Sequence, residues 1–189
     1  GADVIVAQGA EAGGHRGMFL TESIANQPGT MALVPQMVDA VRVPVIAAGG
    51  IADGRGIAAA FALGAAGVQI GSAYLRCPES KVVPLARRVL AEATDDDTVI
   101  TNVMTGRPAR GVVNRTMREV GPVTSETPPF PHASAAFGPL KAMAEKQGRT
   151  DFTNLWAGQA IALSREMPAA DLTRLLAKEA TERLSKLAG

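Results

Sequence analysis

The residues best suited to chemistry lie in a glycine-rich segment, AQGAEAGGHRG, at residues 7–17. His15 stands there among four glycines, directly after an apolar run, and it is one of only two histidines in the chain. An imidazole has an ordinary pKa of about 6.5, so at neutral pH it can accept a proton from a carbon acid. Once protonated, it can hold an anionic group instead. On residue type alone, His15 is either a solvated loop residue or a catalytic residue on a loop that passes close to a bound ligand.

Two loops farther along the chain have the residue types of a phosphate site. Gly49 and Gly50 end an apolar run in the segment AAGGIADG. Gly71 and Ser72 end the next apolar run in QIGSAY. Residues without bulky side chains let backbone N–H groups approach an anion, and the N-terminus of a following helix adds its positive dipole. Two consecutive loops of this kind are typical of the phosphate site after strands 7 and 8 of a (β/α)8 barrel.

Apolar runs alternate with helical patterns in the first part of the chain. Strands are predicted at residues 3–9, 43–51 and 66–75, and helices at 30–41 and 55–64. This alternation favours right-handed βαβ units and a parallel sheet, so the fold class is α/β. The phosphate loops identify the strands as strands 6, 7 and 8 of a TIM barrel. On that interpretation the chain is the C-terminal half of a larger enzyme, and five βα units would lie upstream.

The sequence predicts three parts that differ in their secondary structure. Residues 1–78 would form the C-terminal part of the barrel, 79–150 a small helical domain that acts as a lid, and 151–189 C-terminal helices that return to the barrel. The elements predicted beyond residue 79 are helices at 81–94, 134–147 and 168–187, one short strand between 95 and 115, and an irregular proline-rich connection at 121–134.

Composition and charge exclude several classes of partner. The chain has 189 residues, of which 47% are hydrophobic, and its formal net charge is +1. There is no arginine-rich or lysine-rich block for nucleic acid and no apolar run of the roughly 18 residues that a membrane span needs. Cys77 is the only cysteine, which leaves no disulfide framework or thiolate metal cluster and fits a reducing cytoplasm. The sequence predicts no metal site and leaves a homodimer open.

Four segments together resemble a known family: AQGAEAGGHRG, PVIAAGGIADGRGIAAAFALGAAGVQIGSAYL, GRPARGVVNR and LWAGQA. They occur in order over most of the chain and are similar to the nitronate monooxygenases, formerly called 2-nitropropane dioxygenases, and to their class I branch most of all. The resemblance implies non-covalent FMN at the C-terminal face of a TIM barrel, covered by a smaller helical domain. It also implies oxidation of alkyl nitronates, such as propionate 3-nitronate, by O2 to a carbonyl compound and nitrite or nitrate.

The same resemblance assigns roles to particular residues. His15 takes the place of the family's catalytic histidine, and Gln8 and Gly13 would contact the flavin. The remaining predicted cofactor contacts surround the FMN phosphate from two sides: Gly49 and Gly50 on one, and Gln69, Ile70, Gly71 and Ser72 on the other.

Two other functions compete with nitronate oxidation. A flavin-dependent enoyl-ACP reductase on the same fold shares a closely similar EAGGH loop and AAGGIADG strand end, and would take electrons from NADH. Alternatively, the chain is an incomplete, non-catalytic flavin-binding fragment, because half a barrel exposes an unpaired strand edge.

The sequence also contains other reactive, polar or aromatic side chains near these motifs or in the loops. Glu11 and His132 are interpreted as ordinary loop residues, and Cys77 as an inert core thiol. Arg107 and Arg110 in GRPARG are interpreted as solvated arginines of a turn. Trp156 and Gln159 could line a lid over the flavin, or Trp156 could seal the helical domain against the barrel.

Overall fold

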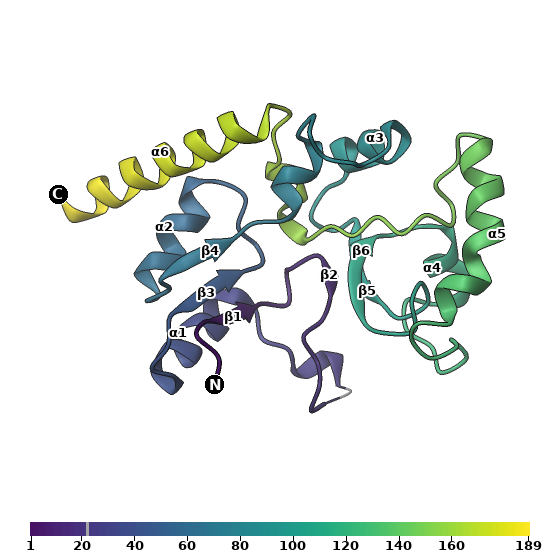
Figure 1. The fold of residues 1–189 in the computed structure, drawn as a ribbon, viewed down its shortest axis with the longest axis horizontal. Helices are drawn as coiled ribbons and strands as arrows, with labels where there is room; N and C mark the ends of the chain where they lie inside the picture. Colours follow the sequence, from purple (N-terminus) through teal and green to yellow (C-terminus); the bar gives the residue numbers. More distant parts are fainter. Residues whose placement is uncertain (22) are drawn as a thin grey trace.

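The computed structural model describes residues 1–21 and 23–189. Figure 1 shows two groups of elements. On one side, where both ends of the chain also lie, the parallel sheet is accompanied by helices α1 (Thr30–Ala40), α2 (Gly54–Ala62) and α6 (Ala169–Ala188). On the other side lie the strands β5 (Thr98–Thr101) and β6 (Ala109–Val112) and the helices α4 (Arg115–Val120) and α5 (Ala133–Lys146). The short strand β2 lies between the two groups, and so does the segment that leads back from α5 toward α6.

The first sheet has three parallel strands in the order β1-β3-β4. These are β1 (Ile5–Gln8), β3 (Val45–Ala48) and β4 (Gly67–Gln69), and the connections contain α1 (Thr30–Ala40) and α2 (Gly54–Ala62). The predicted βαβ units and α/β class are therefore confirmed. Gln8 pairs with Ala48, and Ala48 pairs with Gln69, so the three strands end at the same level. The loops that follow them must meet at one edge of the sheet.

The third predicted strand, at residues 66–75, is wrong beyond Gln69. The chain turns at Gly71 and forms the 3-10 helix η2 (Ser72–Arg76), in which the Tyr74 N–H donates to the Gly71 carbonyl at 3.0 Å. A short apolar run is buried equally well as a strand or as a helix, so periodicity did not separate the two. The end of β3 is clearer, because Gly49 and Gly50 have φ values of +110° and +69°, which favour glycine.

A second, antiparallel sheet has the strand order β2-β6-β5. It consists of β2 (Gly14–His15), β6 (Ala109–Val112) and β5 (Thr98–Thr101). The one short strand that the sequence predicted between 95 and 115 is confirmed as β5, but the sequence missed β6 and predicted no strand in the glycine-rich loop, where β2 lies. A two-residue strand has no alternation to detect, and it forms only because β6 offers its edge. His15 pairs there with Ala109, so the histidine loop belongs to this sheet.

The remaining elements are mostly helical. The three predicted helices are confirmed as α3 (Pro84–Glu92), α5 (Ala133–Lys146) and α6 (Ala169–Ala188). The sequence missed α4 (Arg115–Val120), whose N-cap Asn114 accepts from the Met117 N–H, and the short 3-10 helices η1 (Ile24–Asn26) and η3 (Gln159–Leu163). Within the described residues, no helix combines the length and apolar character that crossing a bilayer requires.

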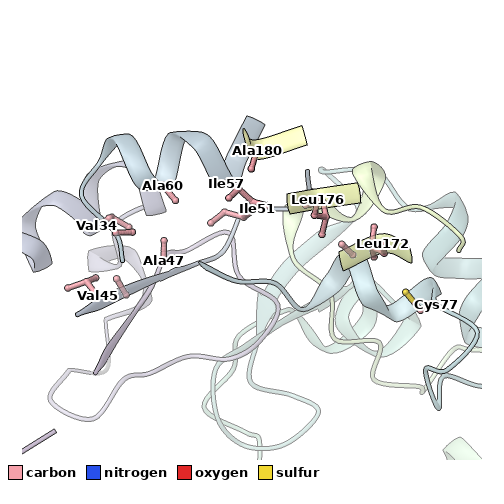
Figure 2. Packing of buried hydrophobic residues seen from close by; sticks show 14 residues of the cluster. Val34, Val45, Ala47, Ile51, Ile57, Ala60, Cys77, Leu172, Leu176 and Ala180 are labelled. Atoms are coloured by element: carbon pink, nitrogen blue, oxygen red, sulfur yellow. The ribbon is translucent and has the colours of Figure 1, made fainter. Parts of the chain in front are cut away.

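The main hydrophobic core lies between the parallel sheet and the helices α1, α2 and α6. Leu172, Leu176 and Ala180 recur along one face of α6, and Figure 2 shows them with Ile51 and Ile57. Burial of an aliphatic side chain contributes about 1.5–3 kcal/mol, so this face fixes the C-terminal helix on the sheet layer. The core therefore holds the βα loops in place from beneath.

Truncation of this face should unfold the protein more easily. Leu172 is 0% exposed, so Leu172→Ala leaves a cavity and should lower the free energy of unfolding by about 3 kcal/mol. Leu187, in the same helix, is 76% exposed, and Leu187→Ala should change the free energy of unfolding by less than about 0.5 kcal/mol. Urea titration followed by circular dichroism measures both. Equal effects would show that α6 is not held by this core.

Candidate active site

A cavity of about 240 Å³ lies at the edge of the parallel sheet where the strands end. Its walls come from the loops after β1, β3 and β4 and from the segment around Trp156 and Gly158. All but one of the predicted cofactor-binding residues line it: Gln8, Gly13, Gly49, Gly50, Gln69, Gly71 and Ser72. The register of the parallel strands brings these residues together, because their loops leave the sheet at the same level.

Ile70 is the exception among the predicted cofactor residues. Its side chain packs with Val68 and Tyr74 against the main core, in a groove beside α2 and α6. Neighbouring residues of an extended chain point to opposite faces, so Ile70 faces away when Gln69 faces the cavity. The Ile70 side chain therefore has a packing role.

The wall opposite the sheet is built by close contact between backbones. A Cβ atom at Gly13 would lie 2.5 Å from the carbonyl carbon of Ala157, and a Cβ atom at Gly158 would lie 2.5 Å from the backbone carbonyl oxygen of Glu11. The Gly158 N–H donates to Ser72 Oγ at 2.8 Å. Because the Ser72 oxygen accepts this bond, its own proton remains available for an acceptor in the cavity. Sequence reasoning singled out LWAGQA but did not identify Gly158 as part of the wall.

The sequence predicted that the N-terminus of α2 helps to bind an anion in the cavity, but its N–H groups are already bonded to carboxylates. The Gly54 N–H donates to Glu179, and the Arg55 and Gly56 N–H groups donate to Asp53. These carboxylates satisfy the free donors of the first turn and oppose its dipole. Among the described residues, the N–H groups of Gly49, Gly50, Gly71 and Ser72 have no recorded acceptor. These are the donors that an anion in the cavity would meet.

His15 lies beside the cavity, next to an aromatic side chain of its wall. The ring centroids of His15 and Trp156 are 5.6 Å apart, and Trp156 lines the cavity. Phe130 meets the imidazole edge to face at 5.8 Å, and His15 Nε2 is 2.9 Å from Thr105 Oγ1. The ring is thus held by contacts from three separate segments of the chain.

The pKa of His15 is lowered below its ordinary value. The first cause is desolvation, because the surrounding protein disfavours the charged ring, and the second is the positive charge of Arg107. His15 is therefore neutral at pH 7 and stays neutral to more acidic pH than a free imidazole. In this state it can accept a proton.

Gln8 positions the histidine loop through its side-chain amide. Its Nε2 donates to the His15 carbonyl at 2.9 Å, and its Oε1 accepts from the Gly17 N–H at 2.9 Å. The end of β1 is thereby linked to the C-terminal end of β2 and to the residues just after it. The sequence predicted a flavin contact for Gln8, and the geometry adds this second, structural role.

Two buried arginines support the glycine loop from behind, and sequence reasoning missed both roles. Arg16 is 4% exposed and donates to the carbonyls of Ala12 at 2.9 Å and Gly9 at 2.6 Å. Arg110 is 9% exposed and donates to the Ala10 carbonyl at 2.9 Å. The interpretation of Arg110 as a solvated turn residue is wrong. A loop without regular structure leaves carbonyls unpaired, and a guanidinium supplies several donors at once.

The family model for nitronate monooxygenase matches residues 1–179. The chain belongs to the nitronate monooxygenase family. A nitronate monooxygenase from Pseudomonas aeruginosa is 46% identical over 180 residues, which cover 95% of this chain and 51% of that protein. The chain spans about half the length of the curated relatives it matches.

Two solved structures have a similar fold. A nitroalkane oxidase from Streptomyces ansochromogenes is 40% identical with a TM-score of 0.90, and the match covers 99% of this chain and 54% of that one. FabK from Thermotoga maritima is 34% identical with a TM-score of 0.80, covering 100% of this chain and 58% of the other. The fold of this chain therefore recurs in longer proteins, a nitroalkane oxidase among them.

Other candidates on this member of the nitronate monooxygenase family have structural roles. The Glu11 carboxylate accepts from the Thr30 N–H and hydroxyl, each at 2.9 Å, at the first turn of α1. Its interpretation as a loop carboxylate is confirmed, with this helix-capping role added. His132 is exposed and Cys77 is buried, as expected, and burial raises the pKa of the Cys77 thiol. Trp156 contacts both His15 and the cavity.

The effect of Arg107 on His15 can be tested by removing its charge. Arg107→Met should raise the pKa of His15, because the nearby positive charge that disfavours the imidazolium is lost. Arg107→Lys keeps the charge and should leave the pKa low. NMR titration of the His15 ring signal, assigned with His15→Gln, measures both. A pKa that is unchanged in Arg107→Met would contradict the electrostatic cause.

Proposed function

We propose that this chain carries the catalytic histidine and the phosphate side of an FMN site in a nitronate monooxygenase. The reaction is oxidation of alkyl nitronates, such as propionate 3-nitronate, by O2 to a carbonyl compound and nitrite or nitrate. The observation that carries the proposal is the cavity at the strand ends, with His15 held against its Trp156 wall. Family membership supplies the reaction class.

In this proposal β1, β3 and β4 are strands 6, 7 and 8 of a (β/α)8 barrel. Their parallel order with intervening helices supports this assignment. So does the likeness to longer chains, of which this one covers 54% and 58%. Residues 109–120 and 133–146 would then belong to the smaller helical domain beside the flavin.

The residues around the cavity fit a phosphate group. A Cβ at Gly71 would meet no atom of the described chain within 4 Å, so the space beside this backbone is open. The N–H groups of Gly49, Gly50, Gly71 and Ser72, together with the Ser72 hydroxyl, would donate to the FMN phosphate. Bound FMN would accept the electrons that the substrate loses. The protein supplies position and protons.

His15 would act as the general base toward neutral nitroalkanes. Its unprotonated ring nitrogen takes the proton from the carbon next to the nitro group, which leaves a nitronate anion and an imidazolium. The lowered pKa keeps the ring unprotonated at pH 7. A nitronate formed there would then lie near the positive charges of the imidazolium and Arg107, and a nitronate bound directly would lie near that of Arg107.

A side chain placed in the phosphate space should block FMN without unfolding the protein. Gly71→Val adds atoms where the chain leaves room, and the Gly71 φ of −105° is open to any residue. Flavin binding should weaken by at least about tenfold, because steric exclusion removes phosphate contacts. Gly138→Ala, also with no atom within 4 Å but on helix α5, should not change it. Titration of apoprotein with FMN measures both, and unchanged affinity in Gly71→Val would place the phosphate elsewhere.

The substrate class is tested with the FMN-loaded protein expressed from its whole gene, which is mixed anaerobically with propionate 3-nitronate. We expect bleaching of the flavin absorbance, and reoxidation with nitrite release when O2 is admitted. With nitroethane in place of the nitronate, His15→Asn should slow bleaching by about 100-fold or more, because the general base is lost. A rate unaffected by this substitution would remove His15 from the mechanism.

The alternative enzyme, an FMN- and NADH-dependent enoyl-ACP reductase, stays in competition because it shares the EAGGH and AAGGIADG motifs. The same experiment separates the two functions. Bleaching by NADH and not by the nitronate would establish the reductase and overturn nitronate oxidation. A protein that binds FMN but is bleached by neither reagent would instead be the non-catalytic flavin-binding fragment.

A further inference from the structure

One ring nitrogen of His15 is already engaged by a buried hydroxyl group. His15 Nε2 lies 2.9 Å from Thr105 Oγ1, a distance at which one of the two atoms must donate a proton to the other. Thr105 is 6% exposed and follows β5, far from His15 in the sequence. Which atom donates decides which nitrogen of His15 remains free to act as a base.

The other bonds of Thr105 settle the direction. A hydroxyl group has one proton to donate and can accept two hydrogen bonds. Thr105 Oγ1 donates its proton to the Arg107 carbonyl at 3.2 Å. A switch of the hydroxyl toward His15 would break this bond. With its proton on the Arg107 carbonyl, Thr105 Oγ1 is left to accept from His15 Nε2–H.

We propose that Thr105 is a positioning residue that keeps His15 in the tautomer protonated on Nε2, so that Nδ1 takes the substrate proton. The proposal rests on the proposed function of His15 as a base. In the step itself, the C–H bond of the nitroalkane breaks, its electron pair stays with the nitronate, and the proton forms a bond with Nδ1.

The packing around the ring supports a fixed orientation. Phe130 meets the imidazole at 5.8 Å with an interplanar angle of 79°, and Trp156 lies at 5.6 Å. A half-turn of the ring would put Cε1 in the place of Nε2 and Cδ2 in the place of Nδ1, which would break the bond to Thr105, and these aromatic neighbours restrict it. No partner for Nδ1 is recorded in the described part of the chain, whereas Nε2 is bonded. The ring therefore presents one nitrogen for chemistry.

The tautomer can be observed directly, without any activity. We would express the FMN-loaded protein from its whole gene and record its histidine ring ¹⁵N chemical shifts at about pH 8, which is above the ordinary histidine pKa. The signal that His15→Gln removes should show a protonated Nε2 and an unprotonated Nδ1. Thr105→Val should give a mixture of tautomers, and Thr105→Ser should restore the wild-type pattern. A protonated Nδ1 in the wild type, or an unchanged ratio in Thr105→Val, would overturn the proposal.

A second readout separates the role of Thr105 from general damage to the fold. Nitroethane needs a base, whereas its preformed nitronate anion does not. Thr105→Val should slow flavin reduction by nitroethane by about tenfold, the size of effect that orienting partners of histidine have, and Thr105→Ser should recover most of it. Reduction by the nitronate should change by less than about twofold. Equal slowing with both substrates would contradict positioning of the base.

These results also separate the two proposals. If neither nitroethane nor the nitronate reduces the flavin in the wild type, the proposed function fails, and if the nitronate alone reduces it, the role of Nδ1 as a base fails. If nitroethane reduces the flavin at the same rate in the wild type and in Thr105→Val, only the role of Thr105 fails.

Discussion

The glycine loop between β1 and β2 depends on two buried guanidinium groups. Arg16 and Arg110 donate to the carbonyls of Gly9, Ala10 and Ala12, which lie in irregular backbone and have no strand partner. Burial of an unpaired carbonyl costs about 1–3 kcal/mol, so each of these bonds favours the observed path of the loop. That path brings Gly13 against Gly158 and gives the cavity its wall.

The same constraint couples distant parts of the chain at the site. The Gln159 N–H donates to the Glu11 carbonyl at 3.0 Å, and Gly158 is bonded to Ser72. On the other side of the loop, His15 pairs with Ala109 of β6 and meets Thr105. The loops of the parallel sheet form one side of the cavity, and the antiparallel sheet holds the histidine. Neither sheet alone contains both.

Most of the first sheet was predictable because its signals are local. Apolar runs, the Asp53 cap of α2 and the positive φ of Gly49 and Gly50 depend on neighbouring residues, and they place the strand ends well. The strand predicted at 66–75 was too long because a buried 3-10 helix and a buried strand have the same composition. The strands β2 and β6 were missed because they pair with each other from distant parts of the chain, and that pairing leaves no pattern in a single sequence.

By itself, the sequence determined the α/β class, the family and the glycine, serine and histidine residues around the strand ends. Each of these depends on residue type and short spacing. Only the tertiary structure decided that Ile70 faces the core, that Arg110 is buried beneath the loop, and that Glu179 accepts from the N-terminus of α2. It also decided which ring nitrogen of His15 meets Thr105, 90 residues away. Hydrogen bonds and packing between distant segments leave no pattern in a single sequence, because they depend on where the folded chain brings those segments together.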